Sequence, residues 1–202
     1  MSLRFKKIFE RQSKKLVTFT TGGDPDLETS KKILEIIADN NIDIVEIGMP
    51  FSDPMADGPT IQLSSSRAIN NGITLDDIFN IANYLRNKKP DIPIILMGYY
   101  NVIHSYGINN FVNKCKKNQI DGLIIVDLQP EEDTELNELL KKNNIDLIRL
   151  ITPTTNEDRL KTILNNASGF LYYVTITGIT GQHSANLEEL KNSIKIIKNH
   201  TN

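Results

Sequence analysis

The stretch that decides the fold runs from Asp43 to Gln62 and reads DIVEIGMPFSDPMADGPTIQ. Its first six residues form a short, almost continuously apolar run, which is typical of a parallel strand because helices cover both faces of such strands. A stiff loop rich in proline, aspartate and glycine follows directly. Glu46 interrupts the apolar run, and the alternation of side chains along a strand points it to the same face as Ile44 and Gly48.

The same order of a short apolar run followed by a helical pattern recurs along the chain. Six strands are predicted, over Leu16–Thr20, Asp43–Gly48, Pro93–Gly98, Gly122–Asp127, Asp146–Ile151 and Phe170–Ile176. The helices that follow them are predicted over Glu28–Asp39, Leu75–Lys88, Ile108–Asn118, Glu131–Asn143, Glu157–Asn166 and Leu187–Asn199, and a short helix over Leu3–Gln12 precedes the first strand. This alternation indicates βαβ units in a single domain over residues 1–202.

The spacing of the units leaves two architectures open. Strand starts at residues 16 and 170 enclose five repeats of about 31 residues, which suits the module of a (β/α)8 barrel. Eight such units need about 250 residues, so an open doubly wound sheet fits the 202-residue length better. The open sheet usually carries a G-x-G-x-x-G turn after its first strand, and the turn Thr21–Pro25 lacks that spacing. Length therefore favours the open sheet, whereas the loop chemistry favours the barrel.

Composition excludes several classes of function. The chain has 23 Lys and Arg against 25 Asp and Glu, and its lysines are scattered among acids, so there is no basic stripe for nucleic acid or an anionic membrane. Neither a signal peptide nor a membrane-spanning apolar run is evident. Cys115 is the single cysteine, and with three scattered histidines it makes no disulfide and no metal-ligand cluster. We therefore expect a cytoplasmic protein that binds no metal.

Two carboxylates near the end of the second strand are the main candidates for chemistry, because barrel enzymes place their sites at the C-terminal ends of strands. A buried carboxylate is costly unless it is hydrogen-bonded or protonated. Glu46 is therefore either a satisfied core residue or an acid/base whose pKa is raised by desolvation. Asp57, in the stiff loop, is able to reach the same cavity. Paired carboxylates in different surroundings can divide acid and base roles.

Aromatic and glycine-rich segments add weaker signals. Four aromatic residues are expected to face the barrel interior, namely Phe19, Tyr99, Tyr100 and Tyr172. Aromatic rings there are more often core than ligand wall, although tyrosines at strand ends favour a site. The segment 175–184 combines glycines with hydroxyls, so its backbone N–H groups could hold an anion and its flexibility suits a lid.

The segment Glu46–Gln62 closely resembles the signature of the tryptophan synthase alpha chain family. Supporting matches follow the other strands, at residues 19–25, 97–101, 126–132 and 178–181. The resemblance implies a (β/α)8 fold and retro-aldol cleavage of indole-3-glycerol phosphate, a small phosphate ester, to indole and glyceraldehyde 3-phosphate. It also implies an alpha2-beta2 heterotetramer in which the beta chain carries pyridoxal phosphate and this chain carries no cofactor.

Residue by residue, the resemblance implies that Glu46 is the acid/base that protonates indole C3 and assists removal of the glycerol hydroxyl proton. It implies that Asp57 stabilises charge at the indole N–H. The substrate contacts that it implies are Phe19, Ile61, Met97, Tyr99, Tyr172, Thr180 and Gly181, the last two in the lid and phosphate cup. The beta-chain contacts that it implies lie in the loop after the second strand, at Pro50, Ser52, Asp53 and Pro54.

Family members continue into seventh and eighth βα units, which supply most of the phosphate-binding N–H groups. The sequence therefore predicts about six units, an incomplete barrel, and exposed edges on the first and sixth strands. The leading hypothesis is a lyase with an incomplete phosphate cup. The alternative is a non-catalytic, truncated alpha-type chain that only docks on the beta chain and stimulates it. Another phosphate-binding barrel enzyme of aromatic amino-acid synthesis is disfavoured, because such enzymes lack the long Pro/Asp loop after a strand-two glutamate.

Overall fold

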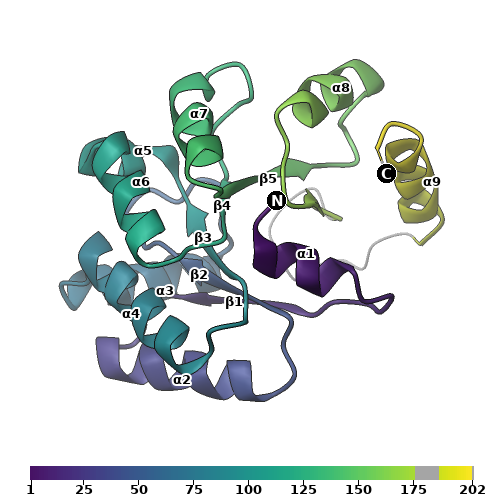
Figure 1. Ribbon diagram of the computed structural model, residues 1–202. Coiled ribbons are helices and arrows are strands. Elements are labelled where there is room, and N and C mark those ends of the chain that lie inside the picture. The colour runs from purple at the N-terminus through teal and green to yellow at the C-terminus, as the bar shows by residue number, and fades with distance from the viewer. Residues whose placement is uncertain (176–186, 202) are drawn as a thin grey trace.

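The computed structural model describes residues 1–175 and 187–201. Within them six parallel strands form one sheet in chain order, so that each strand pairs with the next. The strands are β1 (Val17–Thr21), β2 (Ile44–Gly48), β3 (Ile94–Gly98), β4 (Gly122–Ile125), β5 (Asp146–Ile151) and β6 (Leu171–Tyr173). The sheet curls, and most of the helices lie on its outside (Figure 1). This is the architecture of a (β/α)8-type barrel seen over six units, and it excludes the open doubly wound sheet.

The helices that connect and flank the strands in these residues are α1 (Leu3–Phe9), α2 (Leu27–Asp39), α3 (Pro59–Asn70), α4 (Leu75–Lys88), α5 (Tyr100–Tyr106), α6 (Ile108–Lys117), α7 (Thr134–Lys142), α8 (Glu157–Asn165) and α9 (Leu187–Lys198). Side chains cap the N-termini of α2 and α4. Asp26 accepts a hydrogen bond from the Thr29 N–H at 2.8 Å, and Thr74 forms a capping box with Asp77.

Helices α3 and α5 were not predicted from the sequence. The loop after β2 was expected to run on to Gln62, but Pro59 begins α3 after Gly58 as N-cap. Proline suits the first helical position because its missing N–H would have no partner there. Several other elements are shorter than expected. For example, α7 begins at Thr134 rather than Glu131, because the Glu132 N–H closes a turn onto the Gln129 carbonyl at 3.1 Å.

Apolar side chains form two layers on the two faces of the curled sheet. The outer layer, between strands and helices, includes Leu34, Ile47, Ile78, Leu85, Leu96, Phe111, Leu123 and Leu140. The inner layer contains Ile44, Ile95, Ile124 and Ile148 together with Phe5 and Ile8 of α1. Helix α1 therefore closes the N-terminal end of the barrel, and the opposite end is left for the loops that follow the strands.

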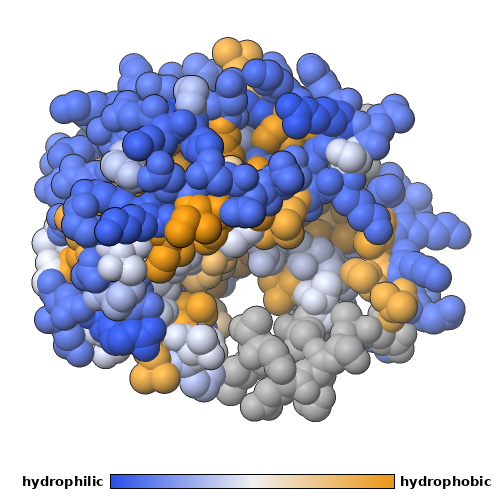
Figure 2. All heavy atoms as spheres, turned by 90° about the horizontal axis from the view of Figure 1, so that it is seen from below, coloured by the Kyte–Doolittle hydropathy of each residue, from blue (hydrophilic) through white to orange (hydrophobic). Residues whose placement is uncertain are grey.

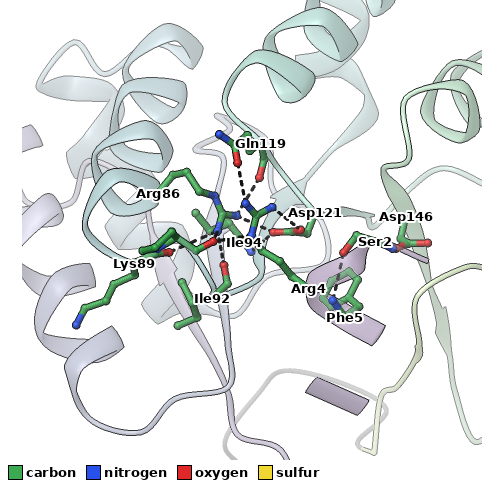
Figure 3. Close-up of polar contacts among 11 residues, drawn as sticks. Ser2, Arg4, Phe5, Arg86, Lys89, Ile92, Ile94, Gln119, Asp121 and Asp146 are labelled. Atoms are coloured by element: carbon green, nitrogen blue, oxygen red, sulfur yellow. Dashed lines mark hydrogen bonds and ion pairs between the residues drawn. The ribbon is translucent and has the colours of Figure 1, made fainter. Parts of the chain in front are cut away.

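A buried charge cluster fastens that N-terminal end. Asp121, which is 2% exposed, accepts hydrogen bonds through Oδ2 from Arg86 Nη2 at 2.7 Å and from the Ile94 N–H at 3.0 Å. Its Oδ1 lies 3.2 Å from Arg4 Nη1, and Arg4 also donates to Gln119 Oε1 at 2.7 Å. Figure 3 shows the two guanidinium groups converging beside Asp121. The cluster ties α1, α4 and the starts of β3 and β4 together.

The outside of the molecule is mostly hydrophilic, with apolar side chains visible toward the middle of the face seen in Figure 2. In the described part of the sheet β1 and β6 are the two edge strands, as expected. Over residues 1–175 and 187–201, no helix has the length and apolar character that crossing a membrane requires.

Candidate active site at the C-terminal ends of the strands

Glu46 lies at the centre of β2 and is 2% exposed. Its Oε1 is buried without a hydrogen-bond partner among the described residues. Burial penalises the charged form and raises the pKa of this carboxyl to about 7. Of the two interpretations that the sequence left open, the satisfied core glutamate does not fit this environment. A carboxyl group with this pKa can both donate and accept a proton near neutral pH.

The neighbours of Glu46 come from three strands. In the sheet register it is paired with Phe19 of β1 on one side and with Ile95 of β3 on the other. The charge of Glu46 also contributes to raising the pKa of Tyr172, after the larger effect of burial, which places this β6 tyrosine within electrostatic reach. The aromatic side chains from β1 and β6 therefore flank the carboxyl group inside the barrel.

Gly48 opens the space above Glu46 at the end of β2. A Cβ at this position would lie 2.6 Å from Cζ of Phe19, far inside van der Waals contact. The absence of a side chain therefore lets the Phe19 ring pack across the strand end. Gly48 is also paired in register with Met97 of β3, so Phe19 and Met97 reach the same place from opposite sides.

Asp57 lies at the end of the loop between β2 and α3 and is half-buried. Its backbone N–H donates to the Pro54 carbonyl at 3.1 Å, and its own carbonyl accepts from Gln62 Nε2 at 2.8 Å. Burial raises the pKa of the Asp57 carboxyl, and a hydrogen bond from Tyr99 opposes that rise. The two candidate carboxylates therefore lie in different surroundings.

A cavity of about 20 Å³ lies where these elements meet. It is lined by Phe19, Thr21, Gly48, Met49, Asp57, Ile61, Ser65, Met97, Gly98, Tyr99 and Val126. Five residues named from the sequence, Phe19, Asp57, Ile61, Met97 and Tyr99, thus share one cavity. Glu46 is not part of its wall and connects to it through Phe19 and Gly48.

Some lining residues were not found by sequence reasoning. Val126 follows the end of β4, and its place after a strand was the available signal. Thr21 and Ser65 gave no signal, because α3 was not predicted and its position against β1 was therefore unknown. The hydroxyls of Thr21 and Ser64 lie 2.6 Å apart and hold that helix beside the cavity. Thr180 and Gly181 lie outside the described residues.

Two of the four loop residues expected to face a partner, Ser52 and Pro54, line a groove. The groove has a volume of about 570 Å³ and is lined by Phe51, Ser52, Pro54, Pro59, Gln62, Leu63, Ser66, Ile69 and Asn70. Asp53 is exposed beside it and accepts a hydrogen bond from the Ser52 hydroxyl at 2.5 Å, while Pro50 is half-buried at the start of the loop. Leu63 is 60% exposed, so the groove presents apolar surface to solvent.

In the part of the chain that the structure describes, no group of three or more His, Cys, Asp or Glu side chains lies close enough together to hold a metal ion. The buried carboxyl groups of the site therefore stand without a neighbouring set of metal-ligating side chains among these residues.

Comparison with known proteins gives a consistent picture. A family model described as tryptophan synthase alpha chain matches residues 5–202. Tryptophan synthase subunit alpha from Legionella pneumophila is 34% identical with a TM-score of 0.84, and the match covers 98% of this chain and 73% of that one. A chain of the tryptophan synthase α2β2 complex from Pyrococcus furiosus is also 34% identical, with a TM-score of 0.82 and 92% and 74% covered. Tryptophan synthase from Mycobacterium tuberculosis is 25% identical, with a TM-score of 0.90 and 98% and 76% covered.

Proposed function

This chain belongs to the tryptophan synthase alpha chain family, and on that premise we propose that it cleaves indole-3-glycerol phosphate to indole and glyceraldehyde 3-phosphate. The family supports a lyase role in general. We propose beyond this the retro-aldol reaction, its substrate and the roles of individual residues.

The reaction needs two proton movements around one carbon–carbon bond. The glycerol hydroxyl next to the ring loses its proton and becomes the aldehyde carbonyl, while the electron pair of the breaking bond goes to indole C3, which gains a proton. Glu46 in its neutral form donates the proton to C3, and the resulting carboxylate accepts the hydroxyl proton. One carboxyl group with a pKa of about 7 is matched to both steps near neutral pH.

Asp57 acts on the other side of the ring. Protonation at C3 places positive charge on the indole nitrogen, and the Asp57 carboxylate stabilises that charge through the N–H. Only the ionised form does this. Burial raises the pKa of this carboxyl above its ordinary value, so loss of activity on acidification begins at a higher pH than for an exposed aspartate.

The observation that carries the proposal is the buried Glu46, whose Oε1 has no hydrogen-bond partner within residues 1–175 and 187–201, beside a cavity walled by Phe19, Met97 and Asp57. A cavity of about 20 Å³ has the space of about one water molecule, and an indole ring is far larger. Substrate entry therefore requires the cavity wall to move. The loop that carries Asp57 is the segment that we expect to shift, because its middle is open to solvent, with Ser52, Asp53, Met55 and Ala56 exposed.

The partner that we propose is a tryptophan synthase beta chain, in an alpha2-beta2 assembly like the complex described from Pyrococcus furiosus. The groove between the loop and α3 offers apolar surface, including the exposed Leu63, next to the segment that carries Asp57. Binding there would couple the beta chain to this site. Pyridoxal phosphate belongs to the beta chain in this proposal, and it takes no part in the cleavage step.

The test is release of indole from indole-3-glycerol phosphate by the purified chain, with and without a tryptophan synthase beta chain. We expect Glu46→Gln to lower kcat by about 1,000-fold, because general acid–base catalysis contributes roughly 100- to 10,000-fold. Glu138→Gln, at an exposed position on α7, is the matched control and is expected to keep full activity. Absence of turnover by the unmodified chain, with stimulation of the beta chain intact, would overturn the proposal in favour of a docking role.

A further inference from the structure

The side chain of Tyr99 connects the loop of Asp57 to the rigid part of the barrel. Tyr99 follows β3 directly and is 2% exposed. Its hydroxyl oxygen accepts a hydrogen bond from the Ala56 N–H at 3.1 Å. The carboxyl group of Asp57, the next residue along the loop, lies near enough to the same hydroxyl for the phenol to favour its ionised form and lower its pKa. One phenol group thus acts on two consecutive loop residues.

The hydrogen bond from Ala56 determines which role is left to the hydroxyl hydrogen. A phenol has one O–H to donate and lone pairs that accept. The Ala56 N–H is a donor and uses the oxygen as its acceptor, so the O–H remains to donate to the carboxylate. Burial and the nearby carboxylates of Asp57 and Asp127 raise the pKa of Tyr99 to about 12, so the phenol stays protonated and remains a donor throughout the neutral range.

The tyrosine itself is held from two sides. The N–H of the next residue, Tyr100, donates to Asp127 Oδ1 at 2.7 Å, which fastens the end of β3 to the end of β4. The ring of Phe51, at the other end of the loop, packs against the Tyr99 ring with centroids 5.3 Å apart. The position of the hydroxyl is therefore fixed relative to the sheet. Its hydrogen bond with Ala56 restricts the movement of the loop in turn.

We propose that the Tyr99 hydroxyl is a positioning group that orients the Asp57 carboxylate and latches the Ala56–Asp57 backbone over the cavity. Its role differs from that of the Tyr99 ring, which forms part of the cavity wall. The inference rests on the proposed function for its catalytic meaning, because it assigns Asp57 a fixed orientation toward the substrate. The contacts themselves are properties of the free chain, and they can be tested without turnover.

The first test uses Tyr99→Phe, which keeps the ring and removes only the hydroxyl. In the free protein we expect two changes by NMR. The Ala56 amide exchanges with solvent faster, because it loses its acceptor. The pKa of Asp57, measured from the carboxyl carbon shift, rises, because the hydrogen bond that favours the ionised form is gone.

Tyr106→Phe is the matched control. The Tyr106 hydroxyl also donates to an aspartate, Asp76, at 2.8 Å, but on the exposed side of α5 and α4. This control removes the same kind of bond outside the site, so it leaves the Ala56 exchange rate and the Asp57 pKa unchanged. Unchanged values of both in Tyr99→Phe would overturn the proposal.

The second test measures turnover. If the chain is active, we expect Tyr99→Phe to lower kcat on the order of tenfold, since a hydrogen bond to a charged group is lost. KM stays close to that of the unmodified chain, because the ring remains in the cavity wall, and the acidic limb of the pH profile moves to higher pH with the pKa of Asp57. A raised KM with an unshifted pH profile in Tyr99→Phe would contradict the proposed positioning role of the hydroxyl. Absence of all turnover would count against the proposed function, while the NMR result would still decide the role of the hydroxyl.

Discussion

Glu46 and Asp121 are both carboxylates that are 2% exposed, but Asp121 directly precedes β4 at the N-terminal end of the sheet, whereas Glu46 lies further along, at the centre of β2. At the N-terminal end, Asp121 is surrounded by donors, with Arg86 and the Ile94 N–H on one oxygen and Arg4 on the other. Toward the C-terminal end, Oε1 of Glu46 has no partner among the described residues. The same chemical group therefore meets two different environments within one sheet.

The two environments favour different roles for a buried carboxyl group, one in stability and one in proton transfer. A buried carboxylate that is fully hydrogen-bonded stays ionised and holds its donors in place, whereas one without partners raises its pKa and becomes a proton donor at neutral pH. In (β/α)8 barrels the N-terminal end generally serves stability and the C-terminal end carries the site. Under the proposed function, Asp121 and Glu46 follow that division.

The largest effect on stability is expected for Asp121→Asn. The change leaves Arg86 buried without its charge partner, which typically costs about 3–5 kcal/mol of unfolding free energy. Urea unfolding measures it. Asp91→Asn is the control, because Asp91 pairs with Lys7 on the surface, with a side chain that is 80% exposed, and such pairs contribute roughly 0–1 kcal/mol. Equal losses for the two variants would show that the Asp121 cluster does not fasten the barrel.

The next effect is the pH dependence of stability that Glu46 produces. Its pKa is about 7 in the folded chain and 4.5 ordinarily, so between these values the folded state holds a proton that the unfolded state has released. The free energy of unfolding therefore falls as pH rises through this window, by about 3 kcal/mol. The contribution is fully present below pH 4.5 and is lost above pH 7.

Glu46→Gln removes that contribution, since glutamine does not titrate. Unfolding free energies of the unmodified chain and of Glu46→Gln, measured from pH 4.5 to pH 8, are expected to diverge by about 3 kcal/mol in favour of the variant. A difference that stays constant with pH would mean that Glu46 is not held in a desolvated place.

Asp57→Asn is expected to have the smallest effect, and on activity alone. Loss of one charge-stabilising group lowers kcat on the order of 100-fold, or about 2.7 kcal/mol. The melting temperature stays unchanged because Asp57 is half-buried in a loop and forms no ion pair in the described structure. A lower melting temperature for Asp57→Asn would instead make this residue structural, like Asp121.

The sequence predicted the part of the site that depends on local pattern. Alternation along β2 places Glu46 on the inner face with Ile44, and the Pro/Asp loop places Asp57 after the same strand. The repeat length and the turn after β1 favoured the barrel and total length favoured the open sheet, and the resemblance of Glu46–Gln62 to a known family decided between them. These features depend on neighbours within a few residues, so a single sequence reveals them.

Features that depend on distant residues were not predicted. The Arg86–Asp121 pair joins residues 35 positions apart, and nothing in either segment indicates the other. The start of helix α3 was interpreted as loop, because two prolines and two aspartates precede it closely and Pro59, its first residue, resembles a third turn proline. The contact of the Tyr99 hydroxyl with Ala56 spans 43 positions and was likewise invisible.

The pKa of Glu46 is the most direct test of the division between the two ends of the barrel. It is measured in the free chain by following the side-chain carboxyl carbon resonance of Glu46, assigned with Glu46→Gln, from pH 4 to pH 9. The structure predicts a midpoint of about 7. A midpoint at or below 4.5 would mean that Glu46 is hydrogen-bonded and ionised like a structural carboxylate, and would contradict its role as the proton donor.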